Sequence, residues 1–253
     1  MCDMDGVLYR GDEAIAGAAA AVDRLRAAGI RLAFCTNNSR STPDQYLAKL
    51  DRLGFMVEPS ELLTSAMVTA RVLVERGATG ARAFVVGGEG LRDALGHAGL
   101  EVVGPDAVDV DVVVVGWDPS FDYEAMRAAS RAVLAGASFL ASNDDAAFPA
   151  PDGLLPGAGA ILASIERASG RRAEVIGKPN EPTMNAVSEL LGDAQDVVAV
   201  GDRFETDLEG ARRRGWATVL VLSGVTSADQ AGVLDPAPDL ILDSIAELPD
   251  QYL

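Results

Sequence analysis

Short apolar blocks alternate with amphipathic stretches along most of this chain, which predicts strands and helices that follow one another. Apolar runs that end at small or polar residues predict strands at 30–35, 83–86, 101–103, 110–115, 139–141, 173–176, 197–200, 217–222 and 240–242. Helical spacing of apolar residues predicts helices at 18–28, 64–76, 91–98, 123–135, 156–168, 181–191 and 208–214, and the capping pattern of Thr42-Pro43-Asp44-Gln45 predicts a further helix that ends near Gly54. This alternation is typical of an α/β fold with a parallel sheet.

The pattern starts a fresh α/β unit near residue 80. Residues 142–159 interrupt it and predict a long loop, which contains Asn143-Asp144-Asp145 and Phe148. Loops of this length in compact domains are usually functional or disordered.

Polar side chains gather after a short apolar strand at the very start of the chain and after three of the strands predicted above. The four groups are Asp3-Met4-Asp5-Gly6, Thr36-Asn37-Asn38-Ser39, Gly177-Lys178-Pro179-Asn180 and Gly201-Asp202-Arg203-Phe204-Glu205-Thr206-Asp207. Each group alone also fits an ordinary polar turn. Because the carboxyl ends of parallel strands emerge along one edge of a sheet, we expect the four groups to form one phosphoryl-transfer site.

The acidic residues of these groups suit a metal-assisted attack on phosphate. Asp3 and Asp5 are two residues apart, so strand alternation is expected to aim both carboxylates at one spot, where a cation or a shared proton must offset their repulsion. Asp3, Asp202 and the backbone carbonyl of Asp5 offer the hard oxygen ligands that Mg²⁺ prefers. Asp5 can protonate the leaving alcohol and later deprotonate the attacking water, which favours an aspartyl-phosphate route.

The neutral and basic residues of these groups suit the phosphate itself. Lys178 supplies a second cation, and Thr36 and Asn37 with nearby backbone N–H groups can hold the transferring oxygens. Lys178 is one of only two lysines among 21 basic residues, which favours a chemical role. The other reading, in which one of these two lysines is an ordinary surface residue, stays open.

The order and spacing of the four groups resemble the four signatures of the haloacid dehalogenase superfamily, and most closely its subfamily IIA of p-nitrophenyl and sugar phosphatases. The resemblance implies a doubly wound parallel-sheet core of residues 1–79 and 174–253, with a mobile α/β cap of residues 80–173 inserted between them. It also implies a Mg²⁺-dependent phosphatase. The implied roles are Asp3 as nucleophile, Asp5 as acid/base, Lys178 as phosphate lysine and Asp202 as metal ligand. Asp207 looks like the acid that supports Lys178 or a metal-bound water. Thr36, Asn37 and Asn38 are expected at the phosphate, with Gly6 in a supporting position.

The start of the chain departs from the family pattern. The family usually places several apolar strand residues before the first aspartate, whereas only Met1 and Cys2 stand there in this sequence. A central strand of two residues would be poorly anchored. Either the chain start is assigned too late or the central strand is short.

Charge and composition limit the classes of binding partner and the location that the chain can have. The formal charge of −17 repels nucleic acid and anionic membranes, so the expected partner is a small phosphorylated metabolite. The acidic excess fits a high-salt source or a GC-rich genome equally. No apolar run approaches the roughly 18 residues that span a bilayer, and we expect a cytoplasmic enzyme. Cys2 and Cys35 are expected to be reduced, buried packing residues, and the apolar strand at 110–115 suggests a homodimer through the cap.

Other functions fit parts of the pattern. A phosphorylation-receiving regulatory domain also gathers acids, a Thr and a Lys at strand ends, but such receivers are shorter and carry no inserted domain. The intact Asp3, Asp5, Lys178 and Asp202 argue against a silent binding protein. A phosphomutase of the same fold stays open.

Substrate choice is expected to lie in the cap. Asn143, Asp144, Asp145 and Phe148 follow a predicted strand and could face the core, where carboxylates suit hydroxyl-rich substrates such as sugar or polyol phosphates. The same residues could instead form a solvated acidic loop.

Overall fold

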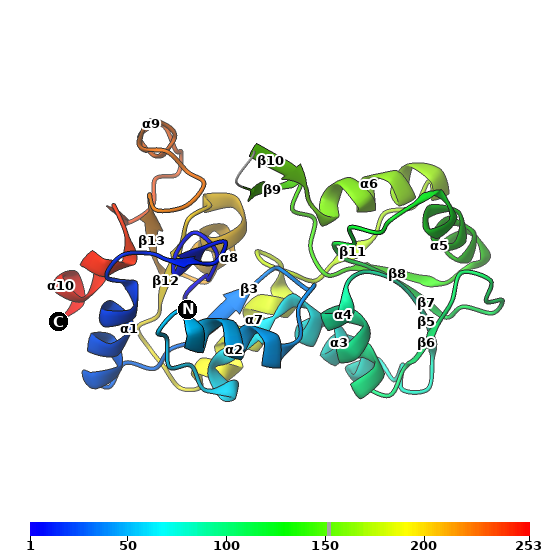
Figure 1. Ribbon diagram of the computed structural model, residues 1–253, viewed down its shortest axis with the longest axis horizontal. Coiled ribbons are helices and arrows are strands. Elements are labelled where there is room, and N and C mark those ends of the chain that lie inside the picture. Colours follow the sequence, from blue (N-terminus) through cyan, green and yellow to red (C-terminus); the bar gives the residue numbers. More distant parts are fainter. Residues whose placement is uncertain (151–152) are drawn as a thin grey trace. The chain divides into compact units, whose positions relative to one another are not determined.

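In a computed structural model that describes residues 1–150 and 153–253, and side chains outside 148–154, the chain forms two units (Figure 1). The first unit comprises Met1–Thr36, Asp44–Leu63 and Thr183–Leu253, and the second comprises Asn37–Pro43 and Thr64–Pro182. Residues 64–79 belong to the second unit because α3 (Ser65–Glu75) packs against α4 (Glu89–His97). The functional division into a core of 1–79 and 174–253 and a cap of 80–173 stays a prediction.

The first unit is built on parallel strands, as predicted. Its strands are β3 (Phe34–Thr36), β4 (Leu62–Thr64), β12 (Val198–Gly201), β13 (Ala217–Val221) and β14 (Leu240–Leu242). β13 pairs with β12 and β14, and Cys2 forms parallel bridges to Phe34 and Val200. Cys2 therefore lies between β3 and β12, in the position of a central strand.

This central position is held by few residues. Met1 donates its backbone nitrogen to Val198 O at 2.9 Å, and Cys2 donates to Ala33 O at 2.7 Å. The strand expected at 30–35 starts only at Phe34, because its pairing with the first residues of the chain begins at Ala33. An apolar cavity of about 350 Å³ adjoins this point, and Met1 and Leu32 are among the residues that line it.

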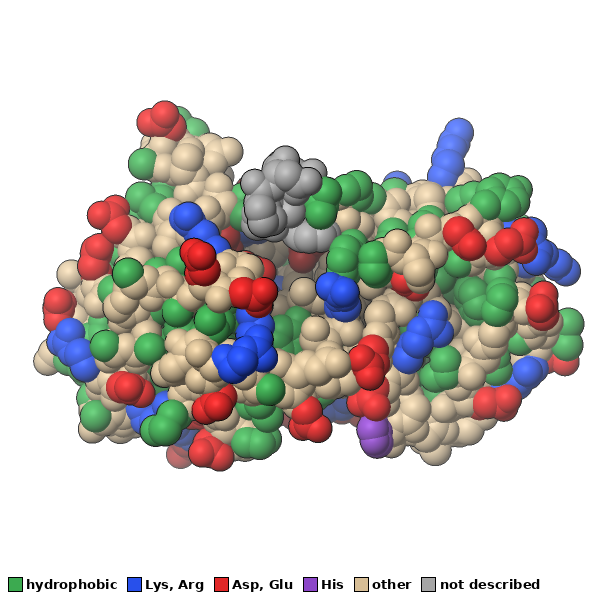
Figure 2. Space-filling model, viewed as in Figure 1, with side chains coloured by type: hydrophobic (Ala, Val, Ile, Leu, Met, Phe, Trp, Pro, Cys, Tyr) green, Lys and Arg blue, Asp and Glu red, His purple; other side chains and the backbone are tan. Residues whose placement is uncertain are grey.

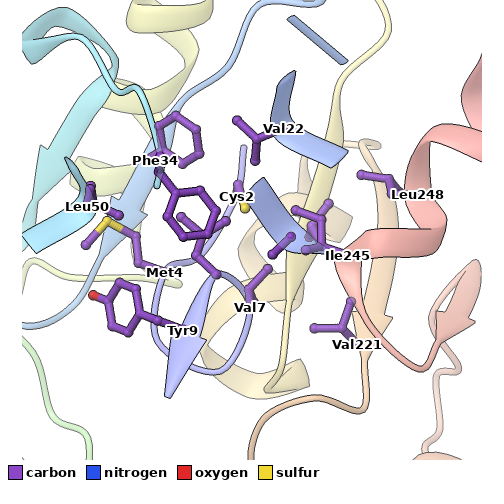
Figure 3. Packing of buried hydrophobic residues seen from close by; sticks show 14 of the residues in the cluster. Cys2, Met4, Val7, Tyr9, Val22, Phe34, Leu50, Val221, Ile245 and Leu248 are labelled. Carbon is purple, nitrogen blue, oxygen red and sulfur yellow. The ribbon is translucent and has the colours of Figure 1, made fainter. Parts of the chain in front are cut away.

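Buried side chains from the start of the chain pack with the sheet and helices of the first unit. Figure 3 shows the side chains of Met4, Phe34, Val221 and Ile245 packed around Cys2. The helices of this unit are α1 (Ala18–Ala27), α2 (Pro43–Arg52), α7 (Glu181–Leu191), α8 (Glu209–Arg213), α9 (Ala228–Ala231) and α10 (Leu248–Tyr252), with shorter turns at Pro59–Glu61, Phe204–Leu208 and Ile245–Glu247. Cys2 and Cys35 are buried and are not joined in a disulfide, which confirms that part of the sequence interpretation.

The second unit contains a five-stranded parallel sheet. Its order is β11 (Glu174–Val175), β8 (Ser138–Ala141), β7 (Val112–Val115), β5 (Arg82–Val86) and β6 (Glu101–Val103). The helices α5 (Tyr123–Ala135) and α6 (Ala158–Ser169) pack against each other, and both contact β7. Both edges of β7 pair, with β8 and β5, and its four valines are buried. The strand that suggested a dimer is thus the middle of the sheet, and that reason for a dimer does not hold.

Two small hairpins were not predicted. The expected loop of residues 142–159 contains β9 (Ala147–Ala150) paired antiparallel with β10 (Gly153–Pro156). Its prolines mask the strand pattern, since proline is excluded from sheet interiors yet fits a ribbon with open edges. In the first unit, β1 (Tyr9–Arg10) pairs with β2 (Glu13–Ala14) just after the first acidic motif.

Charged side chains of both signs are scattered over the face of the molecule in Figure 2. Figure 2 shows the acidic side chains spread over one face rather than gathered in a single patch. Among the residues that the structure describes, none of the helices has the length and apolar character needed to cross a membrane.

Candidate active site

Three buried carboxylates meet at the ends of the central strands of the first unit. Asp3 follows the Cys2 bridge, Asp202 follows β12, and Asp207 lies in the turn Phe204–Leu208. One oxygen atom from each lies within 4.8 Å of the others, and the three residues are only 7%, 4% and 3% exposed. Because Cys2 bridges Val200, the sheet itself brings Asp3 beside Asp202.

Backbone groups fix the carboxylate of Asp202. The Val225 N–H donates to its Oδ2 atom at 2.7 Å. A Cβ atom at Gly6 or at Gly224 would overlap this carboxylate, and Gly6 also has a φ of 84°, which favours glycine. Gly224 and Val225 were not predicted as site residues, although the small residues Ser223-Gly224 after the strand at 217–222 were a signal.

Asp207 is held equally firmly. Its Oδ2 atom accepts the Arg203 N–H at 3.0 Å, and its Oδ1 atom accepts the Thr206 hydroxyl at 3.3 Å. A side chain at Gly201 would overlap it. Three buried carboxylates this close repel one another unless a cation lies among them. Hard carboxylate oxygens are suitable Mg²⁺ ligands, so the residues present fit that ion.

Asp5 occupies different surroundings. The chain bends at Met4 and Asp5 bridges to Tyr9, so alternation along a strand does not set the direction of its side chain. Although Asp5 is exposed, loss of solvent around its carboxyl raises its pKa, and the charges of Lys49 and Arg203 oppose that rise.

Lys49 is a site neighbour that the sequence interpretation left undecided. It lies on α2, partly buried, and its Nζ atom is 3.9 Å from the centre of the Tyr9 ring. Burial lowers the pKa of Lys49, while the carboxylate of Asp5 raises it. A cation thus lies beside the predicted acid/base residue in the first unit.

The predicted phosphate loop begins at the end of β3. Thr36 and Asn37 are 5% and 7% exposed, whereas Asn38 is exposed. The Asn38 side-chain oxygen accepts the Arg40 N–H at 2.9 Å, so this side chain caps its own loop. The backbone and the hydroxyl of Thr36 are the groups of this loop best suited to an anion.

Lys178 and Asn37 are hydrogen bonded within the second unit. The Lys178 N–H donates to Asn37 Oδ1 at 2.7 Å, and Asn37 Nδ2 donates to Lys178 O at 3.1 Å. Lys178 is 1% exposed. The Asn37 side chain therefore forms hydrogen bonds to both the N–H and the C=O of the predicted phosphate lysine.

The predicted specificity residues divide into separate environments. Asn143 is 3% exposed and donates from Nδ2 to Asn37 O at 2.8 Å, and Asp145 Oδ1 accepts from Asn37 Nδ2 at 3.3 Å. Asp144 is exposed. Phe148 belongs to β9, and its side chain lies outside the described part of the structure.

The site residues therefore form two sets, each described within its own unit. The acids Asp3, Asp202 and Asp207 belong to the first unit, and Lys178 belongs to the second. The peptide bond between Thr36 and Asn37 joins the units at the phosphate loop.

Two family models match this chain. One, described as haloacid dehalogenase-like hydrolase, matches residues 1–101, and one described as HAD-hydrolase-like matches residues 175–248. An acid sugar phosphatase of Staphylococcus haemolyticus is 36% identical over 239 residues, which cover 94% of this chain and 90% of that protein.

Solved structures agree with these matches. The p-nitrophenyl phosphatase of Archaeoglobus fulgidus superposes with a TM-score of 0.92 at 34% identity, covering 100% of this chain and 98% of that one. A glycerol phosphate phosphatase of Mycobacterium tuberculosis in complex with magnesium gives 0.90 at 34% identity, covering 98% and 75%. These matches confirm the α/β fold class predicted from the sequence and the resemblance on which it was based.

Proposed function

This chain belongs to the haloacid dehalogenase-like hydrolases, and on that premise we propose that it hydrolyses small phosphate monoesters, with sugar or polyol phosphates as its substrate class. The observation that carries the proposal is the buried group of Asp3, Asp202 and Asp207 at the ends of adjoining strands. Three relatives are named as phosphatases of sugar phosphate, p-nitrophenyl phosphate and glycerol phosphate, and these names support the class of substrate.

The proposed reaction has two steps. In the first, a carboxylate oxygen of Asp3 forms a bond to phosphorus while the bond to the ester oxygen breaks, and Asp5 gives its proton to that oxygen. In the second, Asp5 takes a proton from water, whose oxygen displaces the Asp3 carboxylate and releases inorganic phosphate. The raised pKa of Asp5 favours the protonated form that the first step needs.

Charge complementarity assigns the remaining roles. Asp3, Asp202 and the backbone carbonyl of Asp5 would hold Mg²⁺, which when bound supplies positive charge that offsets the repulsion between carboxylate and phosphate. Gly6 and Asp207 support this set by close packing and by a third buried carboxylate. The phosphate-binding set consists of the Thr36 hydroxyl, the backbone N–H groups of Asn37 and Asn38, and Lys178 as the cation.

The part of the chain at 80–173 is proposed as the cap that selects the leaving group, through Asn143, Asp144, Asp145 and Phe148. Carboxylates accept hydrogen bonds from substrate hydroxyls and repel additional phosphates, so the loop favours polyol over nucleoside triphosphate substrates. A cytoplasmic location belongs to the proposal as well. The homodimer through the cap has lost its reason, since β7 is buried in the middle of its sheet, and sedimentation of the purified chain would measure the oligomeric state directly.

The test is release of inorganic phosphate by the purified chain from a panel of phosphosugars, glycerol phosphate, phosphoglycolate, nucleotides and p-nitrophenyl phosphate. We expect multiple turnovers that require Mg²⁺, stop on chelation and favour polyol phosphates. Single labelling of the protein without turnover would indicate a receiver domain, and conversion of a phosphosugar to its isomer without phosphate release would indicate a phosphomutase. Either result would overturn the proposal.

A further inference from the structure

The Asn37 amide depends on its orientation for its contacts to Lys178. Its oxygen accepts from Lys178 N and its nitrogen donates to Lys178 O, so a flipped amide would lose both hydrogen bonds. The two contacts hold the peptide groups on either side of the Lys178 Cα atom. The orientation of this amide therefore affects the position of the Lys178 Cα atom, from which the lysine side chain extends.

Asp145 adds a third group that favours this direction. Its carboxylate can only accept hydrogen bonds when ionised, and it faces Asn37 Nδ2 at 3.3 Å. With the nitrogen of the amide turned toward Asp145, its oxygen is free to accept from Lys178. An apolar side chain at 145 would remove this contribution and leave the two hydrogen bonds with Lys178 to orient the amide alone.

The Asn143 side chain forms hydrogen bonds with both Asp145 and Asn37. Its Oδ1 atom accepts the Asp145 N–H at 3.2 Å, and its Nδ2 atom donates to Asn37 O at 2.8 Å. The Ser65 hydroxyl also donates to Asn37 O. The backbone and side chain of Asn37 are thus held by residues from separate segments of the second unit.

The sheet of the second unit places these segments side by side. β8 and β11 pair in parallel with Ala141 opposite Val175, and Ile176 N donates to Ala141 O at 2.9 Å. The loops that follow, carrying Asp145 and Lys178, leave the same edge together. A Cβ atom at Gly177 would lie 2.5 Å from Ser142 O and 2.7 Å from Asn37 Oδ1, so the packing here tolerates little displacement.

We propose that Asp145 is a positioning residue for Lys178, acting through the Asn37 amide, and that of the two adjacent acids only the exposed Asp144 serves to distinguish leaving groups. The inference rests on the proposed function, because it assigns Lys178 to the phosphate. It refines the role of the acidic loop. Asp145 affects how Lys178 holds the phosphate, which all substrates share, and Asp144 acts on the part in which substrates differ.

The two roles predict different kinetic patterns. Asp145→Ala should lower kcat/KM by one common factor, about tenfold for a lost interaction of about 1.4 kcal/mol, for every substrate including p-nitrophenyl phosphate. Asp144→Ala should instead change the ranking of substrates. Asp145→Asn, whose side-chain oxygen can still accept from Asn37, should recover part of the loss. Asp106→Ala, which removes an exposed acid elsewhere in the same unit, should match the wild type.

Phosphate binding provides a readout that does not need turnover. Inorganic phosphate should bind Asp145→Ala about tenfold more weakly by calorimetry, with Asp145→Asn between that variant and the wild type and with Asp106→Ala unchanged. Circular dichroism and a melting curve establish that each variant is folded. A substrate-dependent loss in Asp145→Ala, or unchanged phosphate affinity in a folded Asp145→Ala, would overturn the inference. If the wild type bound phosphate but turned over no ester, the proposed function would fail while the binding comparison still decided the role of Asp145.

Discussion

The Nζ atom of Lys49 lies 3.9 Å from the centre of the Tyr9 ring, and Tyr9 bridges to Asp5. This stacking holds a cation from α2 against the short loop that carries the proposed acid/base. Cation–π contacts of this kind contribute about 0.5–2 kcal/mol, depending on how far the cation is desolvated. Lys49 thereby acts on the site through charge, without belonging to any of the four sequence motifs.

Removal of the Lys49 charge should change the pH profile of the enzyme. Burial raises the pKa of Asp5 and Lys49 opposes that rise, so Lys49→Met should raise the pKa of Asp5 further. Because the first step needs protonated Asp5, the limb of kcat/KM that falls with increasing pH should move to higher pH. A glycerol phosphate profile measures this, since an alkoxide leaving group needs the proton. Lys49→Arg, which keeps the charge, is the control, and superimposable profiles for Lys49→Met and wild type would contradict the account.

Gly6 should tolerate no side chain. Gly6→Ala adds a Cβ atom that overlaps Asp202 and places alanine at a φ of 84°, so we expect a loss of both stability and phosphate release. Gly11→Ala is a matched control, because Gly11 has a φ of 55° with open space around the added atom. Strain alone should cost Gly11→Ala about 1–2 kcal/mol in the free energy of unfolding and leave activity intact. Chemical denaturation and phosphate release measure the pair, and equal effects of the two substitutions would show that the Asp202 contact is unimportant.

Salt should stabilise the folded chain. With 38 acidic and 21 basic residues, repulsion among surface carboxylates weakens the compact state, and molar salt screens it over a length of about 3 Å. The melting temperature should therefore rise between low and molar KCl. An uncharged osmolyte at equal osmolality controls for effects unrelated to charge. A flat or falling melting temperature in KCl would contradict this expectation.

Much of the fold was predictable because its signals are local. The helix at 123–135 has both an Asp122 N-cap and a terminal Gly136, and the structure gives the same bounds, Tyr123–Ala135. The β9–β10 hairpin was missed because prolines interrupt its alternation, and the strand expected at 30–35 was too long because its length depends on a pairing partner. A sequence pattern indicates the structure of its own segment, but it does not indicate which other segment will pair with it.

The site shows the same limit. The sequence grouped Asp3 with Asp202 through the rule that parallel strands end at one edge, and the structure places their carboxylates together. That rule does not predict which individual side chains contact one another. The stacking of Lys49 on Tyr9 and the hydrogen bond from Asn37 to Asp145 join residues far apart in sequence, and nothing in either segment alone indicates the contact.

The most direct test of the central claim is the rate of phosphate release by Asp3→Asn. This substitution removes the attacking anion and one charge from the buried carboxylate group, so release from p-nitrophenyl phosphate should fall by several orders of magnitude. The fold should persist, with a melting temperature without Mg²⁺ at least as high as that of the wild type, because one of three repelling charges is gone. Phosphate release by a folded Asp3→Asn at the wild-type rate would contradict the account.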